Sequence, residues 1–352
     1  MPKVAVILIN YKDYAKKYLP ECIASLRAQS YPKDSFKIFI VDNATTPETE
    51  KYLRETAPEA EIILEEKNSG FALGNNLAME AALGANYDYI VLFNMDTIAD
   101  PDWLRELVEA AEADKNVGAV QSLIRLYPEK DKINSLGNEL HFLGFGFCRG
   151  YGEVASNIKY PVANDFFYAS GASVLYPARV LREVGIFDRE FFMYHEDTDL
   201  SWRIRQAGYK IILAEKSLMF HKYQFSRSIL QFYYMERNRL IMLFENFRIG
   251  TLILIFLPFL VMELGMLFYA ALRGLFVTKL KVYGYFFHWR NWQRMIKNKN
   301  AKAKIKKVSD RQLAKLIVGK LEFQEIANPI LKYIVNPILN VYWKIVRQLI
   351  FW

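Results

Sequence analysis

The chain of 352 residues is long enough for one large domain with an appendage, or for two domains. Apolar residues make up 52% of it and aromatic residues 15%, which permits a large core and suggests a part that faces a membrane. The two cysteines, Cys22 and Cys148, lie far apart, which fits a reducing compartment and excludes a Cys-x-x-Cys metal site. The N-terminus lacks the apolar run and cleavage site of a signal peptide, so we expect it to stay in the cytoplasm.

The net charge of +8 is unevenly distributed along the chain. Residues 273–320 contain 14 Lys or Arg and one acid, Asp310, so this segment carries +13 and the remainder carries −5. Such a basic block is typical of a segment that binds nucleic acid or an anionic membrane. Because an apolar segment comes directly before it, we expect a membrane and no nucleic acid.

Short apolar runs alternate with helical patterns over the first ninety residues. Strands are predicted at residues 3–10, 36–41, 61–64 and 87–93, and helices at residues 14–29, 47–57 and about 68–83. Strands that alternate with helices at this spacing indicate βαβ units. The sequence therefore predicts an α/β fold with a doubly wound, mostly parallel sheet.

The next part of the chain is less regular. Further elements are predicted at residues 101–114 (helix), 117–126 (strand), 179–184 and 196–207 (helices), 211–214 and 217–220 (strands) and 226–247 (a long aromatic helix). A strand is also predicted to run into Pro177 after the small residues 169–173. Residues 127–165 show no regular pattern, and a loop of that length in a compact domain is usually functional or mobile.

Polar residues follow several predicted strands at the point where each strand ends: Asn10-Tyr11, Asp42-Asn43, Asn94 with Asp96, and His221. The carboxyl ends of parallel strands meet at one edge of an open sheet, where such folds bind ligands. A carboxylate such as Asp96 can hold a divalent cation through oxygen, and Asp42 can accept hydrogen bonds from a base or a ribose. Each residue alone is explained about equally well by a turn or a helix cap.

Six short motifs then occur in one order: Ile9-Asn10-Tyr11, Val41-Asp42-Asn43, Asn68-x-Gly70-Phe71-Ala72-x-Gly74-Asn75-Asn76, Asn94-Met95-Asp96, Gly171-Ala172 and Glu196-Asp197-x-Asp199-Leu200. With His221 they cover about residues 3–240. On these motifs the chain resembles the family-2 inverting glycosyltransferases with an A-type fold, in particular the rhamnosyltransferase and galactofuranosyltransferase-like branch. It departs from the family at Asn94, where the family has the first Asp of Asp-x-Asp.

The resemblance implies a role for each matching residue. Asp42 would bind the base of the donor, and Asp197 would be the general base. Asp96 and His221 would hold Mn²⁺ or Mg²⁺. The nucleotide would also contact Asn10, Tyr11, Asn68, Gly70, Asn75 and Asn94, and the acceptor would contact Gly171, Ala172 and Glu196.

Three acids, Glu196, Asp197 and Asp199, crowd the start of one predicted helix. The helix dipole stabilises acids in the first turn, which is a sufficient structural explanation for one or two of them. Apolar residues lie directly before them, and an acid between an apolar wall and like charges acquires the raised pKa that a base needs. Arg203 and Arg205 follow on the same helix, and we expect them to pair with the acids.

The C-terminal part has the features of a membrane-associated region. Residues 251–272 form a segment long enough to span a bilayer, interrupted by Glu263 and one proline. Aromatic residues at 283–292 and the polybasic tract 297–307 suit the headgroup level of an anionic membrane. The apolar segment at 328–352 suggests a second, interfacial helix.

We therefore expect a catalytic domain at residues 1–247 and a helical membrane-associated region at residues 248–352. The protein would lie on the cytoplasmic face of the cell membrane, peripherally or with one C-terminal span. On the long helix, Arg237-Asn238-Arg239 is either a site for a lipid phosphate or a solvated helix face.

Taken together, the sequence predicts a metal-dependent glycosyltransferase that moves a sugar from a UDP- or dTDP-sugar to a hydroxyl of a lipid-linked glycan. One alternative is a polyprenyl-phosphate monoglycosyltransferase, whose phosphate acceptor needs no base, so that the Glu196-Asp197 pair argues against it. Another alternative is a non-catalytic membrane scaffold. The presence of Asp96, Asp197 and His221 argues against it. A processive synthase is disfavoured because the chain has neither Gln-x-x-Arg-Trp nor several spans.

Overall fold

The computed structural model describes residues 1–160, 162, 164, 166–222, 228–322 and 329–352. Its centre is a nine-stranded sheet with the order β3-β2-β1-β4-β10-β6-β11-β5, in which β7 pairs with β6. The strands of this sheet are β1 (Val4–Tyr11), β2 (Phe36–Asn43), β3 (Glu61–Glu65), β4 (Tyr89–Phe93), β5 (Thr97–Ala99), β6 (Val117–Leu126), β7 (Ile133–Ser135), β10 (Ser173–Pro177) and β11 (Lys210–His221). A separate pair joins β8 (Asn138–Leu140) to β9 (Gly146–Cys148).

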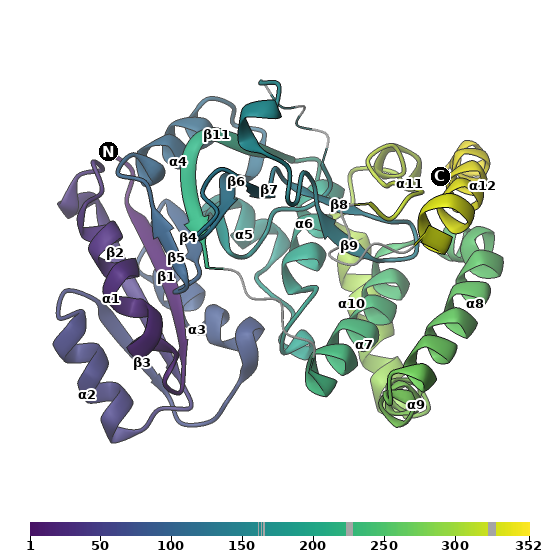
Figure 1. Ribbon diagram of the computed structural model, residues 1–352, viewed down its shortest axis with the longest axis horizontal. Coiled ribbons are helices and arrows are strands. Elements are labelled where there is room, and N and C mark those ends of the chain that lie inside the picture. The colour runs from purple at the N-terminus through teal and green to yellow at the C-terminus, as the bar shows by residue number, and fades with distance from the viewer. Residues whose placement is uncertain (161, 163, 165, 223–227, 323–328) are drawn as a thin grey trace.

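Helices cover both faces of the sheet (Figure 1). One face carries α1 (Tyr14–Arg27), α2 (Pro47–Thr56) and α4 (Trp103–Glu112). The other carries α3 (Gly70–Gly84), α5 (Ala178–Val184), α6 (Glu196–Gln206) and α7 (Ile229–Asn246). Successive side chains of a strand point to opposite faces, so β1 contributes to both cores and must be apolar at nearly every position.

Strand direction brings the predicted site residues to one edge of the sheet. β1 runs parallel to β2 and β4. β10 is antiparallel to both β4 and β6, so β6 and its parallel neighbour β11 run in the same direction as β1. The C-terminal ends of β1, β2, β4 and β11 therefore face one edge, where open α/β sheets bind ligands.

The α/β fold class predicted from the sequence is confirmed, and most elements lie within three residues of their expected positions. The irregular segment after residue 126 differs, because it contains β7, β8 and β9. Strands of three residues are too short to show an alternating pattern. The two short strands expected before His221 form one strand, β11, with an irregularity between Ala214 and Leu218.

The C-terminal helices pack directly against the sheet domain. They are α8 (Ile249–Leu272), α9 (Phe276–Tyr285), α10 (Trp289–Ile305), α11 (Asp310–Leu313) and α12 (Asn336–Leu349). Their buried side chains, among them Ile255, Met295 and Trp343, belong to the same hydrophobic core as α6 and α7. The domain boundary at residue 247 stays a prediction.

Within the described residues, α8 is the one helix long and apolar enough to cross a membrane, with 24 residues and a mean hydropathy of 2.3.

Candidate active site

The first polar pair at the sheet edge joins the ends of β1 and β2. Asn10 Nδ2 donates to Asp42 Oδ1 over 2.7 Å, and Thr49 Oγ1 donates to Asp42 Oδ2 over 2.6 Å. Asn10 and Asp42 are fully buried, whereas the neighbouring Tyr11 is exposed. Thr49 is held in place because it closes a capping box with Thr46 at the start of α2. Asp42 thus fixes the turn after β2, and its contact with the base of a nucleotide stays a prediction.

The turn before α3 lies beside the segment that precedes the acid cluster. Asn68 Oδ1 accepts from Gly70 N over 3.0 Å, and the buried Asn75 donates to the carbonyl oxygen of Phe71 over 2.8 Å. Gly70 has φ +81°, and a Cβ there would lie 2.4 Å from the carbonyl oxygen of Phe192. Only glycine fits, because the backbone is left-handed and the two segments approach closely.

Asp96 and His221 lie side by side although they are far apart in the sequence. Asp96 follows β4, and His221 ends β11, where it pairs with Thr97 of β5. His221 Nε2 lies 3.4 Å from Asp96 Oδ1. Burial alone would raise the pKa of Asp96, but His221 and the Tyr14 hydroxyl lower it below its usual value, so the carboxylate is charged at neutral pH.

Two observations show that this pair fits a divalent cation. His221 Nδ1 lies 3.1 Å from Asn134 Oδ1 and Nε2 lies 3.4 Å from Asp96 Oδ1, so a neutral His221 that donates from Nδ1 to Asn134 would offer the lone pair of Nε2 to a bound cation. Asp96 Oδ1 is buried and accepts no hydrogen bond from the described residues. One oxygen and one imidazole nitrogen suit Mn²⁺. The described part of the chain holds no cluster of three or more His, Cys, Asp or Glu that could bind a metal, so the pair is at most a partial site.

The candidate base Asp197 lies in the first turn of α6 against the segment before β10. Gly171 N donates to Asp197 Oδ2 over 3.0 Å, and Thr198 N donates to Oδ1 over 2.6 Å. The carbonyl oxygen of Ala172 in turn accepts from Asn94 N over 3.0 Å. The end of β4, the Gly171-Ala172 segment and the acid are therefore connected by direct hydrogen bonds.

Burial perturbs the two adjacent acids in the same direction. It raises the pKa of Asp197, although hydrogen bonds from Gly171 and Thr198 oppose the shift. Burial and the charge of Asp197 raise the pKa of Glu196, whose Oε2 accepts no hydrogen bond from the described residues. Two neighbouring carboxylates in a dry site cannot both ionise at low cost, so their protons are held to higher pH than usual. A carboxylate with a raised pKa binds a proton more readily than a free one, which suits a general base.

The segment before the acids has a strained backbone held by one amide. Positive φ angles of 58°, 68° and 68° occur at Phe192, Tyr194 and His195, a conformation that residues other than glycine rarely adopt. Asn238 of α7 is fully buried. Its Nδ2 lies 2.8 Å from three carbonyl oxygens of this segment, those of Phe191, Met193 and Tyr194. Asn238 therefore fixes the path of the chain into Asp197.

Replacing Asn238 by alanine is expected to release this segment. The carbonyl oxygens of this segment lose the two amide hydrogens that they share, so the free energy of unfolding should fall by about 1–3 kcal/mol. The turnover number should fall at least tenfold, which is about 1.4 kcal/mol of barrier, because Asp197 loses its fixed position. Thermal denaturation and steady-state kinetics measure the two effects.

Asn336→Ala is the matched control for that variant. Asn336 is a buried amide that makes two hydrogen bonds to the backbone of Leu321, far along the chain from the acid cluster. This control should lose comparable stability and keep its turnover number. If both variants lose turnover equally, Asn238 acts through stability alone.

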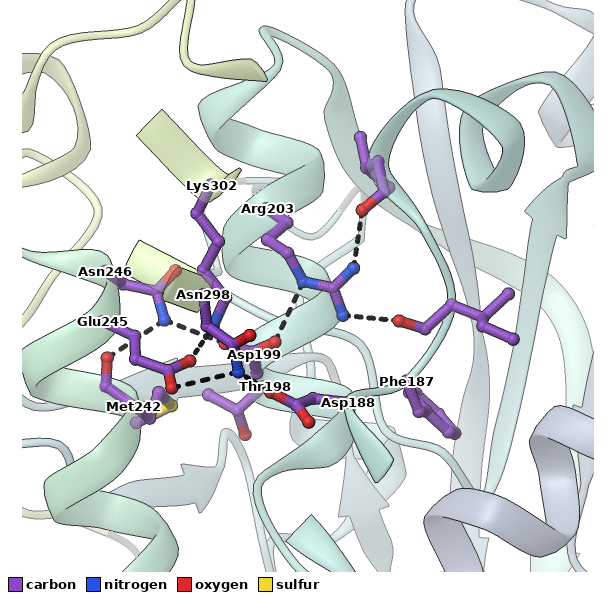
Figure 2. A network of polar contacts seen from close by, with 12 residues as sticks. Phe187, Asp188, Thr198, Asp199, Arg203, Met242, Glu245, Asn246, Asn298 and Lys302 are labelled. Atoms are coloured by element: carbon purple, nitrogen blue, oxygen red, sulfur yellow. Dashed lines mark hydrogen bonds and ion pairs between the residues drawn. The ribbon is translucent and has the colours of Figure 1, made fainter. Parts of the chain in front are cut away.

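The third acid, Asp199, belongs to a buried ionic network shared with the C-terminal helices (Figure 2). Arg203 Nε donates to Asp199 Oδ2 over 2.9 Å, and Asn246 Nδ2 and Lys302 Nζ donate to Oδ1. Lys302 also donates to Glu245 Oε2 over 2.6 Å. Burial would raise the pKa of Asp199, but Lys302 and Arg203 outweigh it and lower the pKa to about 2. The predicted pairing is confirmed for Arg203, whereas Arg205 donates to the backbone carbonyl oxygens of Phe166 and Phe167. Asp199 is a structural acid.

The prediction for Arg237-Asn238-Arg239 is wrong in both its forms. All three side chains are buried, so they form neither a solvated helix face nor an open phosphate site. Arg239 pairs with Glu236 and Glu263. The helix α7 lies between the sheet domain and the helices that follow it, which a single sequence does not reveal.

Four contributors to the site went unrecognised in the sequence: Tyr14, Thr49, Asn134 and Lys302. Thr49 alone had a local signal, the Thr46-x-x-Thr49 spacing of a capping box. Asn134 lies in the segment without a regular pattern, and Lys302 was hidden in a run of similar lysines. Their contacts depend on which elements the fold brings together.

Comparison with known proteins identifies the class of the chain. Residues 5–175 match the model of "Glycosyl transferase family 2". The chain carries a family-2 glycosyltransferase domain, as its motifs indicated. It is 24% identical over 201 residues to an N-acetylglucosaminyl-diphospho-decaprenol L-rhamnosyltransferase of Mycobacterium tuberculosis, covering 52% of this chain and 66% of that protein.

A second relative is much longer than this chain. The O-antigen biosynthesis protein RfbC of Myxococcus xanthus is 27% identical over 235 residues, which is 64% of this chain and 18% of that protein. The chain spans about a fifth of the length of the first curated relatives it matches.

Solved structures show the same fold. The mannosyltransferase PcManGT of Pyrobaculum calidifontis, in complex with GDP-Man and Mn²⁺, aligns with a TM-score of 0.51 and 18% identity over 86% of each chain. TarS of S. aureus aligns with a TM-score of 0.51 and 15% identity over 98% of this chain and 55% of that one. The A-type fold expected from the sequence is confirmed.

Proposed function

We propose that this protein is an inverting glycosyltransferase that moves a sugar from a UDP- or dTDP-sugar to a hydroxyl of a lipid-linked glycan, for a cell-surface polysaccharide. One observation carries the proposal: the Asp96–His221 pair and the half-buried Asp197 are connected through the end of β4 and the Gly171-Ala172 segment. The relatives named for rhamnosyl transfer and O-antigen biosynthesis support this choice of acceptor.

Asp197 would act as the general base of a single displacement. The acceptor hydroxyl attacks the anomeric carbon of the donor, and its proton passes to Asp197 as the new C–O bond forms. The bond from the anomeric carbon to the diphosphate breaks, and the nucleoside diphosphate leaves with the bonding electrons. Thr198 donates to Oδ1 from both N and Oγ1, and Gly171 N donates to Oδ2, which holds the carboxylate in place and leaves a second lone pair on Oδ2 for the proton.

Asp96 and His221 would hold Mn²⁺ or Mg²⁺, which neutralises the charge of a departing diphosphate when it is bound. The solved structures of GalNAc-T7 and PcManGT contain Mn²⁺, which supports a divalent cation. The nucleotide would lie along the same edge, against Asn10, Tyr11, Asp42, Asn68, Gly70, Asn75 and Asn94. The acceptor would lie against Gly171, Ala172 and Glu196.

The two alternatives fit the site less well. A polyprenyl-phosphate monoglycosyltransferase needs no base, whereas Asp197 has the raised pKa and fixed position that suit one. A non-catalytic scaffold does not explain why Asp96 Oδ1 is buried without a hydrogen-bond donor, an arrangement that costs stability.

We also propose that the enzyme works at the cytoplasmic face of the cell membrane, since α8 is strongly apolar and one relative acts on a decaprenol-linked sugar.

Donor binding tests the proposal. We expect UDP- or dTDP-sugars to raise the melting temperature of the purified protein when Mn²⁺ is present, and Asp96→Ala to abolish the effect of Mn²⁺ on nucleotide affinity in calorimetry. Asp102→Ala, which removes an exposed acid at the start of α4, should behave like the wild type. An unchanged Mn²⁺ effect in Asp96→Ala would refute the metal assignment. Absence of any nucleotide-sugar binding would favour the scaffold.

A further inference from the structure

Helix α8 is apolar and exposed along one side only. Its outward stripe has the spacing of three and four residues that marks one helix face, and each member is 61–70% exposed: Ile253, Leu257, Val261, Leu264, Phe268 and Leu272. The opposite side, which includes Thr251, Ile255 and Glu263, is buried against the protein. A helix surrounded by lipid has no such polar, protein-covered side.

The charged residue of α8, Glu263, is buried and forms ion pairs inside the protein. Glu263 pairs with Arg239 of α7 and, over 2.8 Å, with Lys279 of α9. Glu236 of α7 pairs with the same two cations. The side chains of all four residues are at most 9% exposed. This network fixes the orientation of α8, with its apolar stripe outward.

The chain on both sides of α8 belongs to one folded body. Segments that follow α8 bond to segments that precede it: Lys279 to Glu236, and Lys302 to Asp199. Arg248 N, just before α8, donates to Asp310 Oδ2 over 2.9 Å. A single crossing of a bilayer would place these partners on opposite sides. The helix therefore cannot span a membrane while these contacts exist.

Neighbouring segments extend the outward apolar surface. Tyr342 of α12 donates to the carbonyl oxygen of Leu254 in α8 over 2.6 Å, so the two helices touch. The outward stripe of α12 consists of Ile338, Val341, Ile345 and Leu349, and Phe287 and Trp289 are 88% and 67% exposed. Figure 1 shows α8, α9 and α12 together at the end of the molecule opposite α2 and β3. We call the stripes of α8 and α12 the apolar end face.

The charges of this region point to a specific occupant of the apolar end face. Exposed basic side chains occur in α9, α10 and α12 and between them, including Arg273, Lys281, Arg290, Lys332, Lys344 and Arg347. Asp310 is the one acid between residues 264 and 321, and it is buried, while residues 329–352 contain no acid. Apolar stripes, an exposed tryptophan and uncompensated cations complement an anionic lipid surface.

We propose that the apolar end face rests in one leaflet of a bilayer with anionic headgroups, and that α8 lies parallel to the membrane instead of crossing it. The inference deepens the proposed membrane location and rests on it. Lys302 of α10 connects the acid cluster, through Asp199, to the C-terminal helices that carry this face.

Vesicle flotation of the full-length protein tests the surface. We expect binding to vesicles of phosphatidylcholine with 30% phosphatidylglycerol and weaker binding to phosphatidylcholine alone. Leu257→Glu with Leu264→Glu should lower the bound fraction at least tenfold. Leu64→Glu, which changes an exposed leucine at the opposite end of the molecule, should bind like the wild type. Equal binding of the double variant would overturn the proposal, as would a dimer that the double variant dissociates without any vesicle binding.

Labelling distinguishes a parallel helix from a span. In a Cys148→Ser background, single cysteines replace Lys216, before α8, and Lys304, after it; both lysines are exposed. In inverted membrane vesicles from expressing cells, an impermeant maleimide should label both cysteines without detergent. Labelling of residue 304 only after detergent would show a span and overturn the proposal. Neither experiment uses donor or acceptor, so calorimetry with nucleotide-sugars in detergent still decides the proposed function separately.

Discussion

Asp197→Asn is expected to lower the turnover number by about 10²–10⁴-fold, the usual worth of a general base. Asparagine keeps the size of the side chain but cannot take a proton. Nucleotide affinity should change by less than about threefold, or about 0.6 kcal/mol, because Asp197 contacts Gly171 and Thr198 and not the strand ends predicted to bind the donor. Steady-state kinetics with a hydroxyl acceptor and calorimetry with a nucleotide-sugar measure the two quantities.

The pH profile separates a base from a structural acid. Burial raises the pKa of Asp197, so wild-type turnover should fall as the pH is lowered through that raised value and the carboxylate becomes protonated. Asp197→Asn should lack this limb of the profile. Glu196→Gln should leave this limb nearly in place, because the pKa of Glu196 is raised more strongly and keeps that side chain neutral where Asp197 titrates. Near wild-type transfer by Asp197→Asn would mean that the acids only start a helix, and the alternative with a phosphate acceptor would then be preferred.

Lys302→Met is expected to lower the free energy of unfolding by about 3–5 kcal/mol, because one partner of a buried ion pair is removed. Asp199 and Glu245 then face each other without the ammonium that both contact. Urea denaturation measures the change. Lys307→Met is the control. It removes a nearby lysine whose ion pair with Glu183 is exposed, so it should cost at most about 1 kcal/mol.

A double variant shows whether the loss comes from the ion pair. Asp199→Asn with Lys302→Met removes both charges, so it should cost less than the sum of the single variants, with a coupling of at least about 1 kcal/mol. Additive losses would mean that Lys302 contributes by packing and not by its charge. The measurement uses the whole chain, because the C-terminal helices share the core of the sheet domain.

The elements that the sequence predicted well are those with a strong local pattern. β1 and β4 are buried on both faces, and such strands are apolar at nearly every position. The convergence of Asp96 and His221 was also foreseen, because strands that run in one direction must end at one edge. β10 is antiparallel, which its sequence does not show, yet the edge is preserved because a second reversal at β6 restores the direction.

What the sequence did not reveal depends on contacts between distant segments. The sequence does not distinguish the roles of the three acids, because the residues that they contact lie elsewhere in the chain. In the fold, Asp197 accepts a hydrogen bond from Gly171, whereas Asp199 accepts one from Lys302. Glu263 looked like a costly charge within a span. It became understandable once Arg239 and Lys279 were seen beside it. In each case the partner lies far away in the chain, where no local pattern can indicate it.

The contact between Lys302 and Asp199 limits how this enzyme can be recombined with others. A chimera that joins residues 1–247 to the C-terminal module of another transferase would leave Asp199 without its ammonium partner, two residues from the proposed base. The new C-terminal segment would have to provide a lysine that reaches Asp199 as Lys302 of α10 does, or Asp199 would have to be replaced by a neutral residue. Exchanging the C-terminal helices is therefore expected to perturb the proposed active site.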